Sequence, residues 1–156
     1  MILYHLTCRH HARRIEHAGK IIAFPHKMLF PEVGPIVWLV DDPDISRAGA
    51  GIPVLPPGPD GPCDRAECVI EVDTLTATQW APWAVRNVNI IRRQNVENMV
   101  RGSLVAHWWF TPADIHNIVN ITYPPGVSSQ HTPTGGVRMR PTLPQRATHR
   151  RKARRR

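Results

Sequence analysis

The sequence has no apolar run near the roughly 20 residues that a membrane-spanning helix needs. Its first residues, MILYHLT, lack the basic stretch and the long apolar core of a secretory signal peptide. It has only three cysteines, Cys8, Cys63 and Cys68, an odd number that does not suit a disulfide framework. These absences predict a cytoplasmic protein in a reducing compartment, without membrane contact.

Acidic residues are missing from the last part of the chain. Of the 20 lysines and arginines in the sequence, nine lie between Thr134 and Arg156, where there is no Asp or Glu. The first 133 residues therefore hold 11 basic and 12 acidic residues, a net charge of −1, although the whole chain carries +8. The basic character belongs to the C-terminal tail, and the part before it is close to neutral.

The length of 156 residues suits one domain and leaves little room for a second. After Pro124-Pro125-Gly126 apolar side chains become sparse, and Pro, Ser, Thr and Arg dominate. Such a composition is typical of flexible segments, because it offers too little apolar surface to bury. We therefore expect a folded domain over residues 1–123 and a flexible, basic tail over residues 124–156.

Strand signals outnumber helix signals in the expected domain. Thr7 is placed to cap a first helix, and Gly19 to end it in a left-handed conformation. The strands do not alternate with helices as in a doubly wound sheet, so the expected fold class is α+β, with small antiparallel sheets and two to three short helices. Expected strands cover 2–7, 20–23, 36–40, 65–73, 86–92, 104–110 and 115–123, and expected helices cover 8–18, 76–84 and 94–101.

The opening segment is the most informative part of the sequence. His5 and Thr7 lie two residues apart at the end of the first expected strand, so they share one face of it. A helix closed by Gly19 follows before the next strand. Two apolar segments centred on tryptophan come later, Val37-Trp38-Leu39 and His107-Trp108-Trp109-Phe110.

This arrangement resembles the opening of ADP-ribosyltransferase-fold enzymes. It looks most like the DNA-targeting toxin branch and more loosely like the tRNA 2′-phosphotransferase relatives, and it is similar to small bacterial and phage proteins that begin with a Tyr-His-x-Thr strand. The resemblance covers roughly residues 2–121, through short motifs. It implies a cleft for NAD between two small sheets, with nucleic acid as a candidate acceptor.

The resemblance also implies roles for single residues. His5 would hydrogen-bond a ribose hydroxyl of NAD, Thr7 would line the cleft or cap the helix, and Trp38 would pack against the nicotinamide end. Cleavage would leave a positively charged ribose, which a carboxylate stabilises. The late strands here contain no Glu, a departure from the family, and Glu97 is the best candidate for that carboxylate.

Each of these residues also has a purely structural interpretation. His5 could be hydrogen-bonded at a strand end, Trp38 could belong to the core, and Glu97 could be a solvated carboxylate on a helix. Without an acidic partner, the domain would bind NAD or an ADP-ribosylated end and transfer nothing. Phosphotransferase-like chemistry would instead need arginine and histidine around the cleft. The candidates for it are Arg9, Arg65 and His107.

Atoms that could bind zinc are present but poorly spaced. His10 and His11 are adjacent on a helix and do not easily face one ion, and Cys63 and Cys68 straddle a junction between loop and strand. Together with Cys8 they form no recognisable ligand pattern. The sequence therefore predicts no metal site.

The end of the tail predicts contact with DNA or RNA. Its basic side chains neutralise phosphates and release counterions, which gives binding that ignores sequence and weakens with salt. The alternative is a tail that only improves solubility. The residues are Arg150, Arg151, Lys152, Arg154, Arg155 and Arg156.

Three functional hypotheses follow from these features. The first is an NAD-dependent ADP-ribosyltransferase that modifies nucleic acid or a nucleic-acid-associated protein. The second is a degenerate member of the same fold that binds NAD or ADP-ribose and is recruited to nucleic acid by the tail. The third is an unrelated small nucleic-acid-associated protein of phage or bacterial origin. A common cleft for His5 and Trp38, and a carboxylate that reaches it, would discriminate among them.

Overall fold

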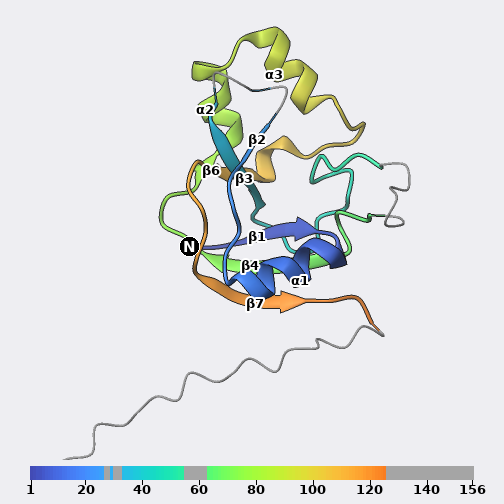
Figure 1. Cartoon of the computed structure of the whole chain (residues 1–156). Helices are drawn as coiled ribbons and strands as arrows, with labels where there is room; N and C mark the ends of the chain where they lie inside the picture. Colours follow the sequence, from blue (N-terminus) through green and yellow to red (C-terminus); the bar gives the residue numbers. More distant parts are fainter. Residues whose placement is uncertain (27–28, 30–32, 55–62, 126–156) are drawn as a thin grey trace, which may run out of the picture.

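The computed structural model describes residues 1–26, 29, 33–54 and 63–125. They form an antiparallel sheet with α-helices packed against it, so the expected α+β class is confirmed (Figure 1). Most of the expected tail, including the basic residues from Arg150 to Arg156, lies outside the described residues. None of the helices in the described part is both long enough and apolar enough to cross a membrane.

The described residues form one sheet of seven short strands. The sequence predicted one or two smaller antiparallel sheets instead. The strand order is β5-β6-β3-β1-β4-β7, and β2 pairs with β3 outside this path. Every pair is antiparallel. The strands are β1 (Ile2–Thr7), β2 (Phe24–Pro25), β3 (Pro35–Val40), β4 (Cys68–Asp73), β5 (Thr78–Gln79), β6 (Trp108–Thr111) and β7 (Ile118–Thr122).

The helices are α1 (Arg9–Ala18), α2 (Trp80–Asn87) and α3 (Ile90–Glu97), and a single 3-10 turn covers Val105–His107. The predicted end of α1 is confirmed. Gly19 has a φ of 65°, and its N–H donates a hydrogen bond to the carbonyl of Ile15. The predicted start is wrong, because Cys8 occupies the N-cap position and no side chain caps the helix there. Thr7 is instead the last residue of β1.

Three expected strands differ from those in the structure. Residues 86–92 contain the end of α2 and the start of α3, because the Asn89 side chain accepts a hydrogen bond from the Ile91 N–H at 2.9 Å and caps α3. The expected strand over 104–110 begins as the 3-10 turn and joins the sheet only from Trp108. Residues 20–23 contribute one bridge, between Ile21 and Ile115, and β2 follows them.

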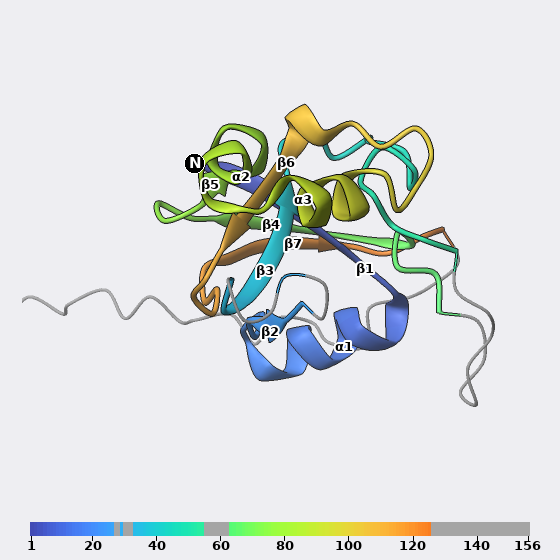
Figure 2. The same cartoon turned by 90° about the horizontal axis from the view of Figure 1, so that it is seen from above.

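Alternation along the strands supplies two hydrophobic cores, one on each face of the sheet. α1 covers one face, and α2 and α3 cover the other (Figure 2). Trp108 and Trp109 contribute to different cores, as their adjacent positions predict. The core under α1 includes Leu3, Ala12, Val37, Leu39, Cys68, Ile70 and Val72. The core under α2 and α3 includes Val40, Trp80, Ala84, Val96, Trp108 and Phe110.

Trp38 lies at the centre of an aromatic cluster that joins β3 to its neighbours. The ring centroids of Trp80, Trp108 and Phe110 lie 5.1, 5.9 and 6.2 Å from its own, and all three rings are steeply inclined to it. The buried N–H of Trp108 donates to the carbonyl of Gly49 at 2.8 Å. The cluster therefore ties the segment around Gly49 to the sheet.

Gly51 lies so close to Trp108 that a side chain does not fit. Its φ is 70°, and a Cβ added there would lie 2.3 Å from the indole ring. We expect Gly51→Ala to lower the free energy of unfolding by about 1–3 kcal/mol, because a left-handed backbone and overpacking both disfavour alanine. Gly34→Ala is the control, since no atom lies within 4 Å of its added Cβ. Urea unfolding measures both variants, and equal effects would contradict this account.

Candidate functional site

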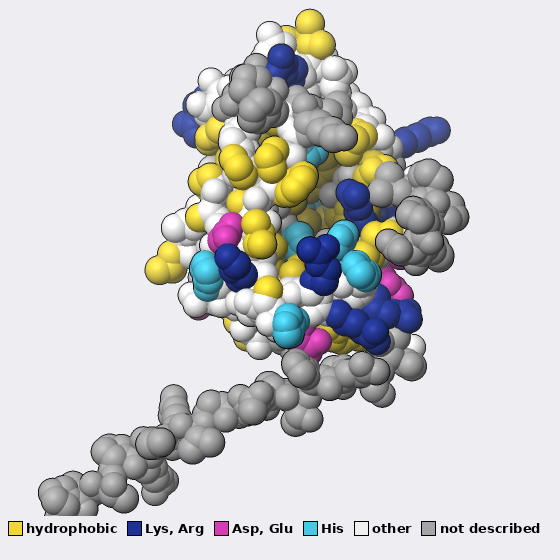
Figure 3. Space-filling view, viewed as in Figure 1, with side chains coloured by type: hydrophobic (Ala, Val, Ile, Leu, Met, Phe, Trp, Pro, Cys, Tyr) yellow, Lys and Arg dark blue, Asp and Glu magenta, His cyan; other side chains and the backbone are white. Residues whose placement is uncertain are grey.

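A cavity of about 760 Å³ opens between the sheet and α1. Most of its walls come from β1, α1, β3, and the segments 20–26 and 50–53, and the rest from Arg65, Val96, Met99 and Trp108. Figure 3 shows one hollowed face of the molecule, where basic and histidine side chains gather below apolar ones. The volume falls in the range of pockets that bind cofactors and other small molecules.

The cavity lies where the ladder between β1 and β3 stops. These two strands pair only between Tyr4 and Val40, whereas β1 pairs with β4 from Ile2 through Thr7. Residues on both sides of the interrupted seam, from Tyr4 to Thr7 and from Ile36 to Val40, line the cavity. An incomplete strand pair therefore gives the site its position in the sheet.

His5 bridges this seam with its side chain. Its Nδ1 lies 3.0 Å from the carbonyl oxygen of Trp38, and because a carbonyl only accepts, Nδ1 carries the proton. That is the only hydrogen bond of the ring to a described residue, so Nε2 remains free to accept one. Burial lowers the pKa of His5; the Trp38 carbonyl opposes this shift and nearby His11 adds to it. The ring is therefore neutral at pH 7 and can accept a hydrogen bond from a ligand hydroxyl.

Thr7 and Trp38 line the same cavity as His5. Thr7 is buried there, which favours the first of its two predicted roles. Trp38 is both a wall of the cavity and a member of the core under α2. Its side chain lies on the opposite face of the sheet from Leu39, which packs on the α1 side. His5 follows Leu3 on the α1 side, so His5 and Trp38 reach the cavity from the two faces of the sheet.

Basic side chains surround the cavity. His11 and Arg14 come from α1, Lys20 follows that helix, and Arg65 precedes β4; we call these four residues the basic rim. Burial lowers the pKa of His11, and neighbouring basic groups, Arg14 and Arg65 among them, lower it further. Lys20 also lies 3.4 Å from Asp114. No Asp or Glu among the described residues lines the cavity, so its field favours anions.

Glu97, the predicted catalytic carboxylate, does not line the cavity. One of its oxygens accepts a hydrogen bond from the Trp80 N–H at 3.1 Å, and the other lies 3.8 Å from the Arg93 Nε. Its neighbours Val96 and Met99 do line the cavity. The structure thus does not bring Glu97 to His5, and Glu97 serves as the acceptor for a buried tryptophan.

Of the residues considered for phosphotransfer, only Arg65 lines the cavity. Arg9 forms an ion pair with Glu67. The Nδ1 of His107 lies 2.7 Å from an oxygen of Asp41, and His107 is not among the cavity residues. The fold therefore places one of the three candidates, Arg65, at the cavity. The spacing of the three residues in the sequence did not distinguish among them.

Three of the four residues of the basic rim, His11, Arg14 and Lys20, were not predicted to line the cavity. His11 and Arg14 share a helix face with Ile15 and Ala18, which also line the cavity, and this three-to-four-residue spacing was a usable signal. Lys20 and His26 come from irregular segments, and no periodicity marks them. His26 packs edge-on against Trp38 at 5.9 Å.

Comparison with known proteins adds no assignment. The chain matches no protein-family model, no curated protein and no solved structure. The chemistry of the cavity must therefore be argued from its own residues.

His5 should make the stability of the fold depend on pH. Its pKa in the folded state is lower than the ordinary value of 6.5. Below pH 6.5 the unfolded chain therefore binds this proton more readily, and the free energy of unfolding should fall as the pH decreases toward the lowered pKa. His5→Gln can still donate to the Trp38 carbonyl, but it does not titrate, so it should flatten this fall.

Urea unfolding between about pH 5 and pH 8 measures the effect. The pKa values of His11 and His26 are also lowered, first of all by burial. Part of the slope of the free energy of unfolding against pH should therefore remain in His5→Gln. His17→Gln is the control, because His17 is exposed on α1. A slope that is the same in wild type and His5→Gln would contradict the assignment of His5 as a partly buried, neutral histidine.

Proposed function

We propose that the domain binds NAD, or another nucleotide that contains ADP-ribose, in this cavity. The observation that carries the proposal is one cavity that joins the neutral His5 to the basic rim, with no lining carboxylate among the described residues. Its volume of about 760 Å³ suits a ligand of this size. The resemblance of the opening strand to ADP-ribosyltransferase-fold enzymes supports the same ligand.

The cavity offers a suitable group for each part of such a ligand. Arg14, Lys20 and Arg65 supply positive charge for the diphosphate. His5 supplies a hydrogen-bond acceptor for a ribose hydroxyl. Trp38 and the apolar side chains around it supply a surface for an aromatic base.

The geometry favours binding over ADP-ribosyl transfer. Cleavage of the glycosidic bond builds positive charge on the ribose, and a preorganised group of opposite charge lowers that barrier by several kcal/mol. Glu97 is held by Trp80 instead. Transfer to nucleic acid or to a nucleic-acid-associated protein is the second candidate. Phosphotransferase-like chemistry would not depend on Glu97, and the presence of Arg65 and His11 at the cavity supports it as the alternative to ADP-ribosyl transfer.

Calorimetric titration of the full chain with NAD and with ADP-ribose should show one bound equivalent. We expect Arg14→Ala to weaken this binding about 5–30-fold, because it removes a charge-assisted contact worth about 1–2 kcal/mol. Arg13→Ala is the matched control, since Arg13 is the preceding residue of α1, is exposed and does not line this cavity.

Two results would overturn the binding proposal. One is the absence of heat and of thermal stabilisation with NAD, ADP-ribose and AMP, and the other is equal weakening in Arg13→Ala and Arg14→Ala. Nicotinamide release in the presence of DNA, RNA or cell extract then separates binding from transfer. Release that disappears in His5→Ala supports transfer, whereas identical background in wild type and His5→Ala eliminates it.

The basic tail supports a second part of the proposal, recruitment to DNA or RNA. Its support is the run of nine basic and no acidic residues from Thr134 to Arg156. Because the cavity of the described domain suits a small anionic ligand, the tail is the part of the chain suited to a long polyanion. Nucleotide binding and nucleic-acid binding should then be separable.

Deletion of residues 134–156 should abolish salt-sensitive binding to DNA and RNA oligonucleotides and leave NAD binding unchanged. Fluorescence anisotropy at several salt concentrations measures this. In the full-length chain, the slope of log K against log salt should be about −0.9 for each DNA phosphate that the tail neutralises. Equal affinity of the full-length and shortened chains would show that the tail is not the binding element.

A further inference from the structure

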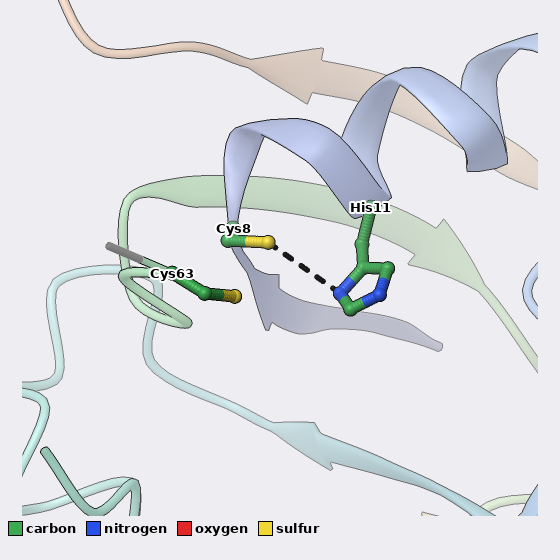
Figure 4. Close-up of side chains that lie close together, drawn as sticks. All are labelled: Cys8, His11 and Cys63. Atoms are coloured by element: carbon green, nitrogen blue, oxygen red, sulfur yellow. Dashed lines mark hydrogen bonds between the residues drawn. The ribbon is translucent and has the colours of Figure 1, made fainter. Parts of the chain in front are cut away.

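Two cysteines and a histidine meet beside the start of α1. The Sγ of Cys8 lies 3.4 Å from the Nδ1 of His11. The Sγ of Cys63 completes a group whose three atoms all lie within 4.8 Å of one another. Figure 4 shows the two thiols and the imidazole turned toward one another. No other group of three His, Cys, Asp or Glu ligand atoms comes together in the described ranges.

Tertiary structure produces this group. Cys8 is the N-cap residue of α1 and His11 follows one turn later, so the two share a helix face. Cys63 comes much later in the chain, in the segment that leads into β4. The pairing of β4 with β1 and the ion pair between Arg9 and Glu67 hold that segment against the start of α1. The spacing of these residues in the sequence argued against zinc. Because the fold brings Cys63 to Cys8 and His11, that spacing does not exclude a zinc site.

We propose that Cys8, His11 and Cys63 bind a Zn²⁺ ion. Two thiolates and a neutral imidazole are ligands that Zn²⁺ prefers. A tetrahedral ion with Zn–S of about 2.3 Å and Zn–N of about 2.1 Å separates sulfur from nitrogen by about 3.6 Å. The Cys8–His11 distance of 3.4 Å already fits this value. Binding displaces the two thiol protons to solvent, and the imidazole binds through the unprotonated Nδ1.

The proposed site is of the open type. The described residues add no fourth ligand atom to the group, and zinc held by three protein ligands keeps a position for water or a substrate. His11 also lines the cavity, so the ion lies at the cavity wall, where the two thiolates balance its charge. The site requires no bound nucleotide, so it is independent of the function proposed above.

The test uses the full chain, stripped of metal with a chelator and kept reduced. Competition with a chromophoric chelator should show one tightly bound Zn²⁺, and Co²⁺ should give the sulfur-to-cobalt charge-transfer bands and tetrahedral d–d bands of a thiolate site. Cys63→Ser and His11→Ala should each weaken Zn²⁺ binding at least tenfold. His10→Ala is the matched control, because His10 is the exposed neighbour of His11 and is not in the group.

Several results would overturn the proposal. These are no stoichiometric binding by the reduced chain, a cobalt spectrum without sulfur bands, and equal affinity in wild type and Cys63→Ser. Zinc held by other histidines of the chain would persist in Cys63→Ser, which also counts against the site. Circular dichroism checks that each variant folds, and Cys8→Ser replaces any that does not. NAD titration of Cys63→Ser keeps the two proposals apart, since failure of one leaves the other measurable.

Discussion

The hydrogen bond from the His5 side chain to the Trp38 carbonyl spans the seam on which the cavity depends. β1 pairs with β4 along its whole length but with β3 only at Tyr4 and Val40. The imidazole thus supplies a hydrogen bond between the two strands where the backbone hydrogen bonds stop. A continued ladder would leave no opening between the strands, and removal of the side-chain bond would leave a partly buried carbonyl without this partner. The same bond fixes the tautomer of His5 and leaves Nε2 free to accept.

The two proposed ligands are chemically compatible with this cavity and with each other. The basic rim attracts an anion, and a Zn²⁺ ion held by Cys8, His11 and Cys63 would not oppose that field, because the two thiolates balance its charge. Glu97 takes no part, because the buried indole of Trp80 needs an acceptor and Glu97 provides it. This hydrogen bond keeps the Glu97 carboxylate out of the cavity that His5 lines. The proposed function is therefore recognition of a phosphate-bearing ligand by cations and a neutral histidine.

The local sequence pattern predicted a helix or strand near the cavity correctly where one signal for secondary structure dominated. The first strand, the helix closed by Gly19 and the apolar third strand are confirmed, because alternation, helical spacing and a left-handed glycine each act over a few residues. The prediction of a strand over residues 86–92 is wrong, because Asn89 caps a helix in the middle of this segment. Thr7 as a helix cap is wrong as well, because its side chain belongs to the cavity wall.

From its residues alone, the chain could be assigned an α+β class, a nearly neutral domain with a basic tail, and His5, Thr7 and Trp38 as residues of interest. The positions of Glu97, Arg65 and Cys63 relative to the cavity depended on how distant segments pair. Periodicity reports which face of its own element a side chain occupies, but it does not report which other element packs against that face. The pairing of β4 with β1 brings Arg65 to the cavity and Cys63 to Cys8, and the packing of α3 against Trp80 turns Glu97 away.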